Sequence, residues 1–504
     1  ELAPLNRKGD IEGSHLEGGI VRTPTGWKEA YQAFKEGGWS GLAVSSEYGG
    51  QGLPKVVASA VNEMWDSSNL SFALCPLLSA GAIEAIECHG NDRIKAMFLH
   101  KLVTGEWSGT MNLTEPQAGS DLSTVTTKAE PEGEHFRIKG TKIYITYGDH
   151  DLTENIIHLV LARLPGAPEG TKGISLFAVP KFLVKDDGSI GERNEVHCLS
   201  LEEKLGIHAS PTAVMSYGED KGAVGYLVGE ENRGLMHMFT MMNNARHAVG
   251  REGLAISESA YQLALQYAME RKQGNVIGTA TQATIVEHSD VKRMLMRMKA
   301  LTEAMRGLTY TCAYAFDVAE RATDEQECSW ANRRGDLLTP VVKGWCTDNA
   351  QIVASLGVQI HGGMGFVEET GAAQYMRDAR ILPIYEGTNS VQAADLVFRK
   401  LFNKNGDIIN KYLDLIKSET KLTNEKIKPF IEEFTYYLNI LTKFSAWISE
   451  KTKTDKDDVS AAANDYLKTL GFVSLAYSWI KILEVSFSDY DTNKDFYEDK
   501  INTA

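Results

Sequence analysis

The chain has 504 residues, 43% of them hydrophobic, which suffices for two to four domains and a large buried core. A formal net charge of −15 argues against a general nucleic-acid-binding protein, although local clusters of Arg and Lys can still hold an anionic ligand. No secretory signal and no apolar run of transmembrane length is found in the sequence; residues 470–485 come nearest and are interrupted by Ser478 and Lys481. A soluble, cytoplasmic protein is expected, with residues missing before Glu1 because the chain does not open on Met.

The six cysteines show no CxxC pair and no metal-ligand spacing with histidine. This pattern predicts reduced, mostly buried thiols and no metal site.

Residues 1–105 are predicted to form a helical domain, because apolar residues recur at helical spacing in 58–66, 80–89 and 93–102. The glycine-rich stretch 45–52 lacks the spacing of a nucleotide-binding loop and predicts a tight turn between helices.

Residues 106–232 are predicted to form a β-domain. Apolar residues alternate with polar ones around Ile138 and Ile145, with a turn predicted at Gly140 between them. Apolar, β-rich runs follow at 156–164, 174–179 and 212–217.

Helical patterns return in residues 233–402, at 236–242, 249–271, 291–320 and 341–356, and predict a second helical domain. Beyond residue 403 the composition shifts to Lys, Asp, Asn and Ile, with helical patterns at 408–416, 427–449 and 459–485. We interpret 403–504 as an appended helical domain. The expected fold class is therefore mainly α with a central β-domain.

The most informative carboxylate is Glu386, which follows an apolar stretch and comes directly before Gly387 and Thr388. This order predicts a buried turn that opens a helix: Thr388 can cap the helix, and Gly387 lets the backbone approach a ligand closely. The neighbours Ile384 and Tyr385 should desolvate the Glu386 carboxylate and raise its pKa toward neutrality. From these residues alone, Glu386 is either a general base or a charge that complements the helix dipole.

The segments Arg-Asp-Ala-Arg-Ile at 377–381 and Ile-Tyr-Glu-Gly-Thr-Asn at 384–389 resemble the active-site segment of the acyl-CoA dehydrogenase family. In that family the glutamate removes the α-proton of an acyl-CoA thioester, while the β-hydrogen leaves as hydride to FAD. The resemblance implies that Glu386 is this base and that FAD is the cofactor. It also implies that the Glu386 backbone N–H and a ribityl hydroxyl of the flavin polarise the thioester carbonyl.

Residues 111–121 resemble the family signature Thr-Glu-Pro-x-Ala-Gly-Ser-Asp. This resemblance implies that Met111, Leu113 and Thr114 bind the flavin and that Ser120 lies near the CoA portion of the substrate. Glu115 and Asp121 are expected to be structural.

Residues 142–148 resemble the next flavin segment and imply that Tyr144 and Thr146 bind the cofactor. The family commonly has Trp at the Tyr144 position and Asn at Tyr147, so the turn at Tyr147 is in doubt.

Residues 359–366 resemble the loop that binds the FAD pyrophosphate and adenosine, which implies cofactor contacts from Gln359, Gly362 and Gly363. Consecutive glycines can present backbone N–H groups to phosphate oxygens. In the family this loop serves FAD held by the neighbouring subunit, so a homodimer is expected. His361 is expected to be a packing residue.

Further cofactor contacts are implied for Thr388 and for Arg271, which resembles the arginine that pairs with the same pyrophosphate. The match degrades after Arg271, where an insertion before Thr284 is expected.

Arg246 falls where the family places an arginine near the CoA moiety, and Asn243 and Gly387 are expected to contact the substrate with it. Some members carry the catalytic glutamate one residue before that arginine. This chain has Ala245 there, so Glu386 is the base that matches the family.

The motifs occur in the family order, and the resemblance implies an N-terminal helical domain, a β-domain, a helical bundle and the appended helical region. With this region, the chain most resembles the dehydrogenases that convert 3-methylmercaptopropionyl-CoA to 3-methylthioacryloyl-CoA in dimethylsulfoniopropionate degradation. Fatty acyl-CoA dehydrogenases of β-oxidation, of short, medium or long chain length, are the alternative. An electron-transfer flavoprotein would then take the electrons. An acyl-CoA oxidase and a scaffold protein without chemistry remain open.

Overall fold

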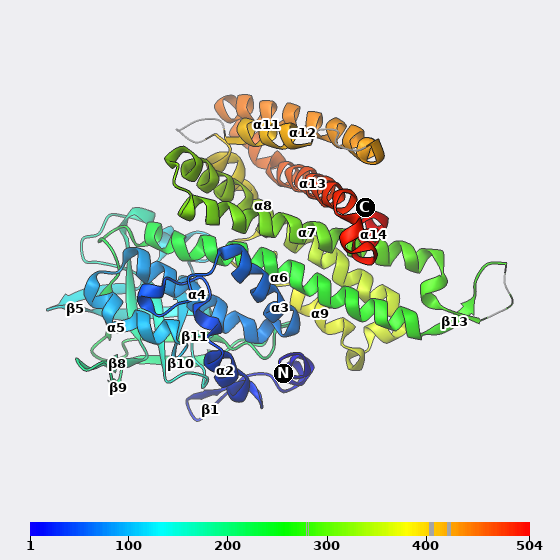
Figure 1. The fold of residues 1–504 in the computed structure, drawn as a ribbon. Coiled ribbons are helices and arrows are strands. Elements are labelled where there is room, and N and C mark those ends of the chain that lie inside the picture. The colour runs from blue at the N-terminus through cyan, green and yellow to red at the C-terminus, as the bar shows by residue number, and fades with distance from the viewer. Residues whose placement is uncertain (279, 281, 403–407, 421–424) are drawn as a thin grey trace. The chain divides into compact units, whose positions relative to one another are not determined.

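The computed structural model describes residues 1–278, 280, 282–402, 408–420 and 425–504. The chain forms two compact units, Glu1–Ala245 and Arg246–Ala504. Their boundary in the sequence falls within one long helix, α6 (Gly234–Glu270). Most of the chain is helical, and an eight-stranded sheet lies in the first unit (Figure 1). The expected fold class, mainly α with a central β-domain, is confirmed.

Helices begin the first unit, and three of them match the predicted patterns. Helix α4 starts where the side chain of Asn69 accepts a hydrogen bond from the N–H of Phe72 (3.1 Å), which satisfies a donor of the first turn. A short hairpin between the first two helices was not predicted, because its three-residue strands give too little alternation to detect. The elements are α1 (Ala3–Glu12), β1 (His15–Glu17), β2 (Ile20–Arg22), α2 (Trp27–Glu36), α3 (Lys55–Ser68), α4 (Leu70–His89) and α5 (Asp92–Val103).

Two helices, α4 and α13 (Lys456–Ser488), are long and apolar enough to cross a membrane by length and composition alone. The expectation that no apolar segment reaches this length was therefore wrong; it overlooked α4, whose apolar run is interrupted by residues such as Ser71 and Ser79. Core helices pass the same test, and 72% of the apolar window of α4 is buried.

The sheet of the first unit has the strand order β10-β11-β5-β12-β7-β6-β3, and β4 pairs with both β5 and β6. Most neighbours are antiparallel, whereas β3 and β4 run parallel to β6. The predicted strands at 156–164, 174–179 and 212–217 are confirmed as β6, β7 and β11. The strands are β3 (Trp107–Asn112), β4 (Lys128–Glu132), β5 (His135–Thr146), β6 (Asn155–Arg163), β7 (Ile174–Pro180), β10 (Val196–Leu201), β11 (Thr212–Tyr217) and β12 (Ala223–Leu227), with a separate hairpin of β8 (Phe182–Val184) and β9 (Ile190–Arg193).

The turn predicted at Gly140 is wrong, because Gly140 lies inside the continuous strand β5. A side chain at this position would meet the Cβ of Thr127 at 2.9 Å. The glycine therefore leaves room for the Thr127 side chain rather than changing the direction of the chain.

In the second unit, α6 is followed by a hairpin of β13 (Lys272–Asn275) and β14 (Gln282–Thr284), which projects from the end of the helix (Figure 1). The patterns at 236–242 and 249–271 belong to the one helix α6 rather than to two. Helices α7 (Ser289–Arg321) and α8 (Glu325–His361) pack along each other. The short helices α9 (Ala372–Ala379) and α10 (Asn389–Asp395) follow, and α10 continues into a π-helical turn, Leu396–Lys400.

The C-terminal region belongs to the same core as α7 and α8. Helix α13 packs against both (Figure 1). Its Leu467, Leu470 and Ile480 are buried in one apolar cluster with residues of α7 and α8. The three predicted helical patterns are confirmed as α11 (Ile408–Glu419), α12 (Lys428–Thr454) and α13, and α14 (Lys494–Thr503) follows. The start of the expected domain, 403–407, lies outside the described residues.

Candidate active site

The loop that carries Glu386 links α9 to α10 and has an unusual backbone. Glu386 adopts a φ of 55° and Gly387 a φ of 82°, so two successive residues lie in the left-handed region. A residue other than glycine is strained there, and such strain is found mainly at functional sites. Thr388 then caps α10, its hydroxyl accepting a hydrogen bond from the N–H of Val391 (3.3 Å), as predicted.

The Glu386 side chain is partly buried and, among the described residues, accepts no hydrogen bond. Burial raises the pKa of this carboxyl to about 7, against the positive charges of Arg246 and Lys343, which act to lower it. Within the described part of the chain the Glu386 backbone N–H also donates no hydrogen bond. Both groups are thus available to a ligand.

Two further side chains of α6 lie beside this loop. Arg246 is 4% exposed, and its Nη1 lies 3.4 Å from Oδ2 of Asp395 on α10. Tyr385, the residue before Glu386, donates a hydrogen bond from its hydroxyl to the fully buried carboxylate of Glu252. Asp395 and Glu252 were not recognised in the sequence, where each is one charged residue in a helical pattern. The Tyr385 bond ties the loop to α6, and the Arg246–Asp395 pair ties α10 to the same helix.

The two segments expected to bind the flavin lie side by side in the first unit. The N–H of Ile143 donates to the carbonyl of Thr114 (2.9 Å), which joins the loop after β3 to strand β5. Tyr144 has a φ of 59° and a ring that is 61% exposed. Met111, Thr114 and Thr146 are partly exposed, whereas Leu113 is buried. An exposed aromatic ring beside these groups fits a flat ring system such as flavin.

A buried ion pair supports the first segment that is expected to bind the flavin, residues 111–121. Lys142 Nζ lies 2.8 Å from Glu115 Oε1 and also donates to the carbonyl of Leu113 (3.0 Å). Glu115 further accepts hydrogen bonds from the backbone and hydroxyls of Thr126 and Thr127. Burial acts to raise the pKa of Glu115, but Lys142 and these donors outweigh it and lower the pKa to about 2. Glu115 is saturated with partners, as expected for a structural residue.

The turn at Tyr147 forms although asparagine is replaced. Tyr147 adopts a φ of 50°, a conformation that asparagine tolerates more easily than tyrosine. Its fully buried hydroxyl donates to the carbonyl of Ser71 (2.7 Å), and its N–H donates to the carbonyl of Pro211 (2.8 Å). These bonds compensate for the strained backbone.

The predicted glycine loop follows the end of α8 in the second unit. Gln359, Gly362 and Gly363 are all exposed, and a Cβ at either glycine would meet nothing within 4 Å. The open backbone fits the approach of a large ligand, although the N–H of Gly362 already donates to the carbonyl of Gln359. His361 is buried and stacks on Tyr267, so its expected packing role agrees with the structure.

The remaining predicted site residues are placed as follows. Arg271 is exposed directly after α6, ahead of the β13–β14 hairpin, where an insertion was expected. Ser120 is exposed in the loop after β3, and Asn243 is partly exposed on α6. In the second unit the structure brings together Glu386, Gly387, Thr388 and Arg246; in the first unit it brings together Met111, Leu113, Thr114, Tyr144 and Thr146.

Four domain models of known families match the chain. "Acyl-CoA dehydrogenase, N-terminal domain" matches residues 20–106, the middle domain 110–218 and the C-terminal domain 232–401. "Acetyl-CoA dehydrogenase C-terminal like" matches residues 408–504. The chain belongs to the acyl-CoA dehydrogenase family. The reaction is therefore the α,β-dehydrogenation of an acyl-CoA thioester, with FAD as cofactor.

Named relatives agree with this membership. The chain is 54% identical over 418 residues to 3-methylmercaptopropionyl-CoA dehydrogenase of Ruegeria pomeroyi, which covers 82% of this chain and 70% of the relative. It is 36% identical over 465 residues to a butyryl-CoA dehydrogenase of Syntrophomonas wolfei, covering 88% of this chain and 76% of the relative. The fold matches the structure of an acyl-CoA dehydrogenase complexed with FAD from Bacillus anthracis with a TM-score of 0.78 at 22% identity, over 95% of this chain and 79% of that one.

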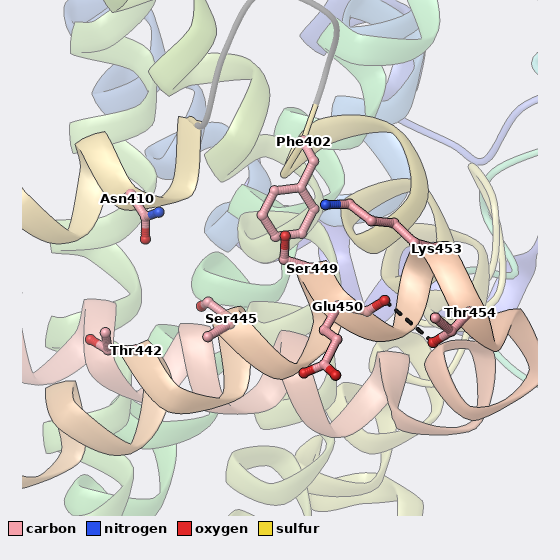
Figure 2. Close-up of a pocket in the computed structure, with 9 residues that line it drawn as sticks. Phe402, Asn410, Thr442, Ser445, Ser449, Glu450, Lys453 and Thr454 are labelled. Carbon is pink, nitrogen blue, oxygen red and sulfur yellow. Dashed lines mark hydrogen bonds between the residues drawn. The ribbon is translucent and has the colours of Figure 1, made fainter.

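A pocket of about 450 Å³ lies beside α12 in the C-terminal region of this acyl-CoA dehydrogenase (Figure 2). Its charged lining side chains are Glu450 and Lys453, and none of the expected site residues lines it. The described residues contain no group of three or more His, Cys, Asp or Glu that could hold a metal ion. Neither feature adds chemistry to the site around Glu386.

Proposed function

We propose that Glu386 is the catalytic base of this acyl-CoA dehydrogenase. The observation that supports this role is a carboxylate without hydrogen-bond partners among the described residues, its pKa raised to about 7, on a strained loop. A base whose pKa lies near the working pH combines sufficient ionisation with sufficient proton affinity.

The chemistry follows from the atoms of the loop. The Glu386 carboxylate takes the α-proton of the acyl thioester, and the electron pair of that C–H bond forms the new double bond. The backbone N–H of Glu386 donates to the thioester carbonyl, which stabilises the negative charge that develops on its oxygen. FAD, when bound, accepts the β-hydrogen as hydride. The buried guanidinium of Arg246 favours the ionised form of Glu386 before the substrate arrives.

The residues that would hold FAD form two groups. In the first unit these are the exposed Tyr144 and its neighbours. Lys142 holds one of them by donating a hydrogen bond to the carbonyl of Leu113. In the second unit the open glycine loop and Arg271 would meet the phosphates, and Thr388 would lie at the flavin. The proposed contacts are Met111, Leu113, Thr114, Tyr144, Thr146, Arg271, Gln359, Gly362, Gly363 and Thr388.

For the substrate we propose Ser120, Asn243, Arg246 and Gly387 as contacts. Arg246 is buried against Asp395, and its charge acts on Glu386. Its proposed contact is therefore with the acyl thioester end of the substrate rather than with the CoA phosphates. The four-part division at 1–105, 106–232, 233–402 and 403–504 remains a proposal, supported by the four separate family matches.

The proposed substrate is 3-methylmercaptopropionyl-CoA, a step of dimethylsulfoniopropionate degradation, on the basis of the 54% identical relative. Anaerobic titration with this thioester is expected to bleach the visible flavin band at one equivalent, more rapidly than butyryl-CoA or a long-chain acyl-CoA. Faster bleaching by butyryl-CoA or by a long-chain acyl-CoA would contradict the proposed substrate and leave the dehydrogenase reaction intact. A purified protein that cannot bind FAD would overturn the proposed function.

For the electron acceptor we propose an electron-transfer flavoprotein. Reduced enzyme mixed with such a flavoprotein should reoxidise, while mixing with oxygen should release little hydrogen peroxide. Stoichiometric peroxide from each turnover would instead identify an acyl-CoA oxidase.

A homodimer is proposed, because the glycine loop is exposed together with the large apolar side chains of Met364 and Phe366 (47% and 87% exposed). Sedimentation of the FAD-loaded enzyme should give at least twice the 55.5 kDa mass of one chain. A monomer with full activity would contradict the proposal. The free cysteines among the described residues support the proposed cytoplasmic location, which cell fractionation would test.

A further inference from the structure

Behind the Glu386 loop lies a lysine that sequence analysis did not single out. Lys343 is fully buried on α8, 43 residues before Glu386 in the sequence. Its Nζ donates to the carbonyl of Gly387 (2.8 Å) and to Oδ1 of Asn389 (2.9 Å). A buried lysine is costly, and lysines are rarely buried without a partner. Here its hydrogen bonds go to the residues that follow the proposed base.

Asn389 extends this contact into a network. Its Nδ2 donates to the carbonyl of Gly344 (3.1 Å), to Thr347 Oγ1 (3.0 Å) and to Asp348 Oδ1 (2.7 Å), all on α8. Gln392 of α10 donates to the carbonyls of Glu386 and Gly387 (3.2 Å each). The backbone carbonyls of the strained loop are therefore held by side chains of two helices.

Resting on the proposed role of Glu386, we propose that Lys343 is a positioning residue of this active site. Its ammonium group donates to the Gly387 carbonyl and so holds the left-handed turn at Glu386 and Gly387. When protonated, it also favours the ionised form of the Glu386 carboxylate. The two charges do not form an ion pair within 4 Å; the carboxylate remains available to the substrate while its ionised form is favoured.

The charges around this pair come from every element packed on the loop. Arg246 and Glu252 lie on α6, Asp348 lies on α8 and Asp395 lies on α10. Burial lowers the pKa of Lys343 to about 7, while Glu386 and Asp348 act to raise it. Each of the two groups therefore favours the charged form of the other.

The test separates the charge of Lys343 from its hydrogen bonds. Lys343→Gln keeps a donor and removes the charge, Lys343→Met removes both, and Lys343→Arg keeps the charge. The readout is the rate of anaerobic flavin bleaching by 3-methylmercaptopropionyl-CoA between about pH 5 and pH 9, roughly two units either side of the Glu386 pKa. FAD content and thermal unfolding are measured alongside. Lys481→Met, on a partly exposed lysine of α13 bonded to Glu484, is the matched control.

Removing a positive charge destabilises the carboxylate, so the pKa of Glu386 should rise. The acid limb of the rate profile should move up by about one pH unit in Lys343→Gln and Lys343→Met. Their rates should fall about fivefold at pH 7 and about tenfold below pH 6, and should recover at pH 9, while Lys343→Arg keeps the wild-type midpoint. Equal loss at all pH values would overturn the inference and assign Lys343 a purely structural role. A wild-type enzyme whose flavin is bleached by no acyl-CoA thioester would instead overturn the proposed function. If Lys343→Met does not retain FAD, Lys343→Gln decides alone.

Discussion

Flavin reduction by acyl-CoA is expected to be lost in the Glu386→Gln variant. The substitution keeps the size of the side chain and its position after Tyr385, but an amide cannot accept the α-proton. Positioned general-base catalysis contributes roughly 10²–10⁴ in rate, so a loss of at least this size is expected. Anaerobic stopped-flow measurement of the visible flavin band checks it. FAD content and acyl-CoA affinity should stay near wild type.

The pH dependence of the wild-type bleaching rate also tests the role of Glu386. Because burial raises the pKa of Glu386 to about 7, the base form disappears as the pH falls below that value, and the rate should drop about tenfold for each further pH unit. Glu432→Gln, an exposed position on α12, is the matched control and should leave the rate unchanged. A Glu386→Gln enzyme that still bleaches at the wild-type rate would require another base.

The Lys142→Met variant is expected to be the most destabilised substitution in the first unit. It leaves the Glu115 carboxylate buried without its charge partner, and breaking a buried ion pair in this way costs about 3–5 kcal/mol. The Leu113 carbonyl also loses its donor, so the flavin segment should loosen and FAD should dissociate more readily. Urea unfolding and the FAD content after gel filtration measure both effects.

Two variants control this experiment. Lys139→Met changes an exposed lysine on the same strand and should alter the free energy of unfolding by less than about 0.5 kcal/mol. Adding Glu115→Gln to Lys142→Met removes the stranded charge and should recover much of the lost stability. A Lys142→Met protein as stable as wild type would show that the pair is not a support of the fold.

The Glu115–Lys142 pair also makes the stability of the fold depend on pH in the acid range. The pKa of Glu115 lies at about 2 in the folded chain, below its ordinary value of 4.5. The ionised Glu115 carboxylate therefore contributes its full stabilisation above about pH 4.5, and this contribution is lost as the pH falls toward 2.

Local patterns in the sequence predicted what depends on near neighbours. Thr388 caps α10 as expected, because a cap needs only the next three residues. Strands β6, β7 and β11 were found from their apolar runs. Gly140 was misinterpreted, since the Thr127 contact that requires a glycine lies on another part of the chain.

The residues that support the site could not be predicted from such local patterns. Lys343 and Glu252 bond to the Glu386 loop, and Asp395 pairs with Arg246 beside it. In the sequence each looks like a charge on a solvated helix face. Only the packing of α6, α8 and α10 shows that these faces are turned inward. The resemblance to a family identified Glu386, but it did not identify the groups that set its charge.

The packing of α13 on α8 limits how such an enzyme can gain or lose its C-terminal region in evolution. Gly344 and Trp345 follow Lys343 directly, and they are covered by Leu467 and Phe472 of α13; a Cβ at Gly344 would meet Leu467 at 2.9 Å. A shorter chain ending before α13 would open this helix face to water next to the Lys343 ammonium. The appended region is therefore not an interchangeable module: its loss in evolution would demand matching substitutions on α8, in the helix that supports the base.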